Sequence, residues 1–105
     1  MVGRFYQLDP DGTIRPFDGS VVDWAIAGHP RELWRTVIGP VSISTRFAGY
    51  DLRPLADSGA PILFETQARS DAAGIIHERR SATLTDAHQA HAEAVALASA
   101  DGREH

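Results

Sequence analysis

The chain has 105 residues, a length at which a single domain can bury a hydrophobic core without disulfides or structural metals. It contains no cysteine, which excludes disulfide bridges, thiolate nucleophiles and cysteine-based zinc sites, and no apolar run approaches the length that spans a bilayer. The formal net charge of −4 argues against the basic footprint of a nucleic-acid-binding protein. All ten basic residues are arginine and asparagine is missing too, which indicates a high-GC genome more than a surface selected for phosphate contacts.

The first part of the chain predicts a hairpin followed by a short helix. Phe5–Leu8 has the pattern of a strand, and Asp9–Gly12 (DPDG) is a turn because proline presets φ and glycine accepts a positive φ. Thr13–Arg15 is the expected returning strand. Ser20, with an acidic residue three positions later, is the N-cap of a helix near residues 20–28.

The middle of the chain predicts two further hairpins. Leu33–Ile38 and Val41–Phe47 are rich in β-formers and are separated by Gly39-Pro40. In Val41–Phe47 every second residue is apolar or threonine, which indicates a sheet with one buried and one solvated face. Ile62–Ala68 and Ile75–Arg80 form the second pair, after a loop over residues 50–60.

The C-terminal part predicts an alanine-rich helix over residues 84–100, with Thr83 as its N-cap. The face expected to pack on the sheet carries Leu84, His88, His91, Val95 and Ala98. Asp101–His105 is predicted to be a disordered tail. The predicted fold is therefore one α+β domain over residues 1–100, a four- or five-stranded antiparallel sheet with both helices packed on one face. The tryptophans of the two halves, Trp24 and Trp34, are expected in the core.

Histidine is the one catalytic residue type that clusters. His88 and His91 share a helical face, and His77 lies on the preceding strand. With a carboxylate, such a set could hold a divalent metal for hydrolysis. The H-x-x-H spacing alone is a weak signal, and a core histidine hydrogen-bonded to a neighbour is the favoured interpretation. We therefore assign no metal site, no cofactor and no catalytic residue.

The solvated sheet face is the stronger candidate for binding a partner. Its predicted members are Ser42, Ser44, Arg46, Gln67, Arg69, Arg79 and Arg80. Such a face could bind an acidic protein patch or a phosphate backbone. The competing interpretation is an ordinary polar face with cross-strand ion pairs to Glu65 and Glu78. Exposed aromatic residues for base stacking are scarce, which argues against single-stranded nucleic acid.

Three segments carry a resemblance to a known group of proteins. Val41–Asp51 (VSISTRFAGYD), Pro61–Thr66 (PILFET) and Ala82-Thr83 with His91 further along the helix resemble a family of small, uncharacterised phage and prophage proteins. The similarity extends over roughly residues 36–95. The sequence departs from the family pattern at Leu84, where tryptophan is usual. The resemblance implies an origin in a mobile element of a high-GC bacterium and supplies no catalytic residues.

The resulting functional expectation is a small non-enzymatic phage or prophage-type protein in the cytoplasm of a bacterial host. It would act by protein–protein contact through its open sheet face or an edge strand, for instance by inhibiting a host or defence factor, or it would pair with itself as a homodimer. The alternatives are a metal-assisted hydrolase that uses the histidines, and a nucleic-acid-binding module that uses the arginine-lined face. No membrane association is expected.

Overall fold

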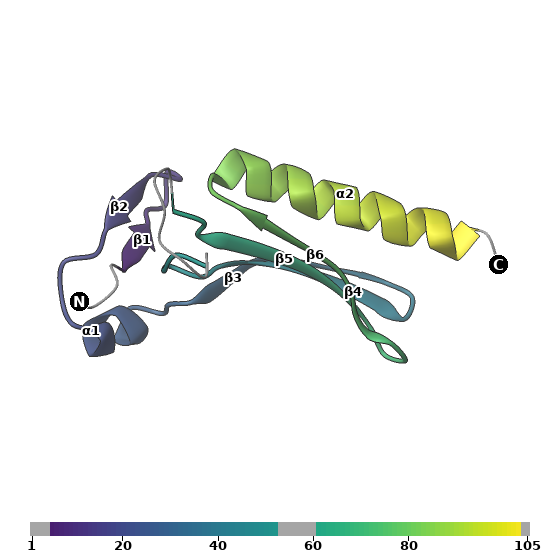
Figure 1. Cartoon of the computed structure of the whole chain (residues 1–105), viewed down its shortest axis with the longest axis horizontal. Helices are drawn as coiled ribbons and strands as arrows, with labels where there is room; N and C mark the ends of the chain where they lie inside the picture. The colour runs from purple at the N-terminus through teal and green to yellow at the C-terminus, as the bar shows by residue number, and fades with distance from the viewer. Residues whose placement is uncertain (1–4, 53–60, 104–105) are drawn as a thin grey trace.

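A computed structural model describes residues 5–52 and 61–103 (Figure 1). The elements in chain order are β1 (Tyr6–Leu8), β2 (Ile14–Pro16), α1 (Val21–Ile26), β3 (Arg31–Ile38), β4 (Val41–Phe47), β5 (Phe64–Ser70), β6 (Gly74–Ser81) and α2 (Leu84–Arg103). Most of the loop expected over residues 50–60, and the last two residues of the expected tail, lie outside the described residues. The helix α2 continues to Arg103, beyond the end expected near residue 100.

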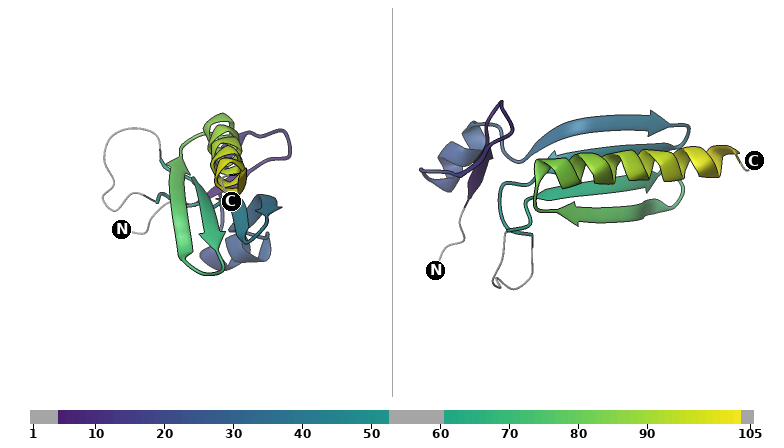
Figure 2. Two further views of the ribbon diagram at one scale, coloured as in Figure 1. Left: turned by 90° about the vertical axis from the view of Figure 1, so that its right-hand side faces the viewer. Right: turned by 90° about the horizontal axis from the view of Figure 1, so that it is seen from above.

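The main sheet has four antiparallel strands in the order β3-β4-β5-β6, and α2 contacts all four of them from one face. Seen from above, α2 runs along the strands over the middle of the sheet (Figure 2). The strands β1 and β2 form a separate two-stranded sheet. The predicted α+β class and four-stranded antiparallel sheet are confirmed. Of the two helices expected on one face of the sheet, only α2 packs there. The short helix α1 lies beyond the end of the main sheet, on the side of β1 (Figure 1).

One tight turn and two bulges help determine the register of the main sheet. The two-residue Gly39-Pro40 turn pairs Ile38 with Val41, and β4 then pairs with β5 without interruption. A register shift in β3 leaves Leu33 as an extra residue, and a second shift in β6 leaves Ile76 as an extra residue. Because side chains alternate between faces, each bulge decides which residues beyond it point to which side.

The core lies between α2 and the sheet. One cluster of buried residues centres on Phe47 and Phe64, whose rings meet edge to face at 5.3 Å, and the other centres on Ile43. The buried face of α2 carries Ala87, Ala90, His91, Ala94 and Ala98. Small alanines on this face let the helix backbone lie close to the strands. The expected face was partly wrong, since His88 is exposed and Leu84 and Val95 are only partly buried.

Trp24 anchors the N-terminal elements. The capping box of Ser20 and Asp23 is present as predicted, and it starts a helix whose one buried residue is Trp24. The indole ring packs on Phe5 and stacks on His29, and its Nε1 donates to the Tyr6 carbonyl at 2.9 Å. Trp24 is therefore a core residue, as expected, and it joins α1 to β1.

Candidate functional site

The face of the main sheet turned away from α2, here called the open face, has no described helix over it (Figure 1). The pairing register sorts its side chains into three rows that cross the sheet from β3 to β6. The first row is Glu32, Arg46, Glu65 and Arg80. The second row is Arg35, Ser44, Gln67 and Glu78. The third row is Val37, Ser42, Arg69 and Ile75.

The first row alternates acidic and basic side chains across all four strands. Glu65 is its centre and is only 6% exposed, although it lies on the open face. Arg46 Nη2 lies 3.0 Å from Glu65 Oε1, and Arg80 Nε lies 3.4 Å from Glu65 Oε2. The two guanidinium groups cover the carboxylate and supply the opposite charge that its burial requires.

The second row continues this network along the strands. Arg35 makes two bonds to the carboxylate of Glu32, at 2.7 and 3.1 Å, and this pairing holds the pKa of Glu32 below its usual range. Gln67 Nε2 donates to Glu78 Oε2 at 2.8 Å, and Arg80 lies 3.7 Å from the same carboxylate group. The charged side chains of the first two rows are thus held in defined positions by contacts within the chain.

The third row is more apolar and lies toward the hairpin ends of the sheet. Val37 is 65% exposed, and Ile75 is about half exposed. Among the described residues, Arg69 has no hydrogen-bond or ion-pair partner for its side chain. This end of the open face therefore combines exposed apolar groups with one uncompensated positive charge.

The structure places six of the seven predicted partner-binding residues on the open face. The exception is Arg79, which pairs with the helix-facing Thr66 and lies 3.4 Å from Glu93 of α2. The arginines do not form a positive stripe, because Glu65 stands between Arg46 and Arg80. The competing expectation of cross-strand ion pairs is confirmed for Glu65, which pairs with Arg46 on β4 and Arg80 on β6. It is wrong for Glu78, whose ion pair with Arg80 lies within β6.

Sequence reasoning missed four members of the rows. They are Glu32, Arg35, Val37 and Ile75. The two-residue Gly39-Pro40 turn contained the signal for part of this set, because it fixes the opposite partner of each β3 residue as far as Trp34. The partner of Glu32 depends on the bulge at Leu33, for which the sequence carries no comparable signal.

His91 lies in a cluster of polar side chains with Thr36, Thr45 and Thr66, here called the polar island, within the core between α2 and the sheet. Its Nε2 lies 2.9 Å from the Thr36 hydroxyl, and its Nδ1 lies 2.9 Å from the Thr45 hydroxyl, which also bonds to Thr66 at 2.7 Å. A neutral imidazole donates from one nitrogen and accepts at the other, so both ring nitrogens are satisfied. Burial is the larger cause, and electrostatic repulsion from the nearby His88 the smaller one, of a lowered pKa of His91. The lowered pKa favours this neutral form.

The three predicted histidines do not form a metal site. His88 is exposed and packs its ring edge to face with Trp34 at 5.3 Å. His77 is partly buried on β6 opposite Ala68, with a buried Nε2 that has no hydrogen-bond partner within the described residues. Across residues 5–52 and 61–103, no three histidine or carboxylate side chains are grouped so that they could hold an ion.

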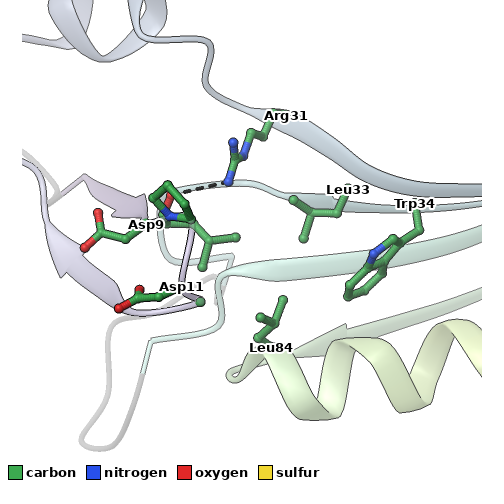
Figure 3. Close-up of a pocket in the computed structure, with 9 residues that line it drawn as sticks. Asp9, Asp11, Arg31, Leu33, Trp34 and Leu84 are labelled. Carbon is green, nitrogen blue, oxygen red and sulfur yellow. Dashed lines mark hydrogen bonds between the residues drawn. The ribbon is translucent and has the colours of Figure 1, made fainter.

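A shallow cavity of about 250 Å³ lies between the β1–β2 turn, β3 and the start of α2 (Figure 3). Leu33, Trp34 and Leu84 form its apolar wall. Its polar groups are already engaged: Arg31 donates to the Leu8 carbonyl at 3.3 Å, and Asp9 is bonded to the neighbouring Arg15. The cavity therefore marks the packing boundary between the N-terminal hairpin and the main sheet, here called the seam. The polar groups that line it are engaged, so none is free to orient a ligand.

No helix within the described ranges has the length and apolar character needed to cross a membrane. No protein-family model matches the sequence, and neither a curated protein nor a solved structure matches it significantly. The open face, the polar island and the seam are therefore interpreted from their own geometry.

Proposed function

We propose that this is a non-enzymatic binding protein that docks a protein partner on the open face of its main sheet. The observation that carries the proposal is the fixed charge network on a face that no described helix covers. Side chains that are already held in place lose little conformational entropy on binding. Fixed opposite charges also make the face selective, since a partner with the wrong pattern meets like charges.

The other candidate sites support this choice by their chemistry. Both nitrogens of His91 are used by threonine hydroxyls, so the imidazole is placed to stabilise the core rather than to move a proton. Two of the arginines that a phosphate backbone would need, Arg46 and Arg80, are paired with Glu65, and the whole chain carries a net charge of −4. A protein surface with its own alternating charges fits the open face better than a uniformly negative polymer does.

The resemblance to small phage and prophage proteins supplies a setting for this binding. A compact mobile-element protein that carries no cofactor acts most directly by occupying a surface on a host or defence factor. Inhibition of such a factor in the bacterial cytoplasm is the form of the proposal that follows from this setting.

A capture experiment with paired variants tests the proposal. Arg35→Glu combined with Glu78→Arg reverses the sign of the charge at both ends of the second row and leaves the net charge of the chain unchanged. Arg79→Glu combined with Glu93→Arg makes the same exchange on the helix-covered side and serves as the control. We expect a stoichiometric host protein to be retained by the wild type and the control and lost by the open-face variant. Equal retention by both variants would remove the open face as the docking surface.

A further inference from the structure

We propose that the open face docks a second copy of the same chain, face to face, about a two-fold axis that runs parallel to the strands between β4 and β5. This inference rests on the proposed function and names its partner. Such an axis lays β3 of one copy over β6 of the other and β4 over β5. Each row of the open face then meets the same row of the second copy in reverse order.

The second row carries the charge complementarity. Arg35 lies on one edge strand and Glu78 on the other, so three strand spacings, about 14 Å, separate them within one chain. They do not pair with each other within the chain. Across the proposed axis, Arg35 of each copy lies over Glu78 of the other, and Ser44 lies over Gln67. Two opposite-charge contacts and two polar contacts result.

The third row gives an independent match. Val37 of one copy lies over Ile75 of the other, which buries two of the exposed apolar side chains of the open face. Ser42 lies over Arg69, and its hydroxyl offers an acceptor to a guanidinium that has no partner within the described part of its own chain. Apolar meets apolar, and the uncompensated donor meets an acceptor.

The first row is compatible with the same axis. Its alternation of sign follows from cross-strand pairing within one chain, so by itself it does not identify a partner. The axis nevertheless places Glu32 over Arg80 and Arg46 over Glu65. Every contact in the row is between opposite charges.

The other face-to-face two-fold arrangement fits poorly. An axis perpendicular to the strands through the second row would place Arg35 over Arg35 and Glu78 over Glu78. It would also place Val37 over Glu32. Like charges that face each other across an interface oppose association, so the charge pattern selects the axis parallel to the strands.

The size of the face indicates a weak, reversible dimer. Four strands of seven or eight residues cover about 19 by 25 Å, so the two faces together bury on the order of 1,000 Å². Interfaces of this size belong to transient complexes. We therefore expect a dissociation constant in the upper micromolar range. At lower protein concentrations the open face is then free to bind a foreign protein.

Sedimentation equilibrium of single charge reversals and their mixture tests the inference. Arg35→Glu alone, or Glu78→Arg alone, creates two like-charge contacts in its own homodimer. An equimolar mixture of the two variants forms a heterodimer in which both contacts join opposite charges. From about 10 µM to about 1 mM protein, we expect the wild type to dimerise, each single variant to dimerise at least about tenfold more weakly, and the mixture to recover near wild-type association.

The outcomes separate the dimer from the proposed function. Wild type that stays monomeric to about 1 mM, or a mixture that associates no better than the single variants, would overturn the dimer. A host protein retained through the open face under those results would leave the proposed function standing with a foreign partner. The Arg35→Glu, Glu78→Arg double variant adds a further separation, because it preserves self-complementarity while it changes the pattern that a foreign protein meets. Thermal unfolding of every variant confirms that the reversals, all at exposed side chains, leave the fold intact.

Discussion

Replacement of Gly49 by alanine should destabilise the fold strongly. Gly49 has a φ of +79°, and an added Cβ would lie 2.5 Å from Cζ2 of Trp24. The indole cannot move aside, because it is 5% exposed and its Nε1 is bonded to the Tyr6 carbonyl. Gly49 itself is held by a 2.8 Å bond from the Tyr6 amide to its carbonyl. A left-handed backbone costs alanine about 1–2 kcal/mol and overpacking about 1–3 kcal/mol, so we expect a loss of about 2–5 kcal/mol.

Urea unfolding followed by tryptophan fluorescence measures this loss. Gly74→Ala is the matched control, since Gly74 has nearly the same φ, +73°, and no atom within 4 Å of an added Cβ. The control should lose only the backbone contribution, about 1–2 kcal/mol. The difference between the two variants isolates the contact with Trp24. Equal losses at Gly49 and Gly74 would refute the packing of α1 against this glycine.

Three further predictions concern the polar island and the open face. His91→Ala should cost about 2–4 kcal/mol, because it opens a cavity and leaves the hydroxyls of Thr36 and Thr45 short of a partner; an unchanged urea midpoint would contradict the network. Burial lowers the pKa of folded His91, so the unfolded chain takes up the proton first and stability should fall as the pH drops below about 6.5, with a shallower fall in His91→Ala. Glu65→Ala should lower the free energy of unfolding by about 1–3 kcal/mol and Glu93→Ala by less than about 1 kcal/mol, since only Glu65 is buried. Comparable losses in thermal unfolding would contradict a stabilising role for the ion pairs of Glu65.

Local patterns in the sequence were enough for the parts of the fold that depend on neighbouring residues. The strand Val41–Phe47 is confirmed to the residue, because period-2 alternation and a two-residue turn fix both its length and its faces. The caps at Ser20 and Thr83 are confirmed for the same reason: each bonds to an amide three positions along the chain, at Asp23 and Asp86.

Features that depend on distant contacts were not predictable in this way. The position of α1 follows from Trp24 fitting against Gly49, residues that lie far apart in the sequence. The face of α2 was misjudged at His88 because alanine contributes little to a hydrophobic pattern, so the helix phase is poorly defined by its composition. The favoured core role of His91 is confirmed, but its partners Thr36 and Thr45, and Thr66 that bonds to Thr45, come from three different strands and meet only after the sheet forms.

Methyl resonances recorded as a function of protein concentration test the role of the open face most directly. Val37 and Ile75 report on that face, whereas Val22 of α1 and Leu97 of α2 are exposed elsewhere and serve as internal references. We expect the methyl signals of Val37 and Ile75 to shift together as the protein is concentrated to about 1 mM, while those of Val22 and Leu97 stay in place. Shifts confined to Val22 or Leu97, or no shift in any of the four residues, would contradict docking of a second copy on the open face.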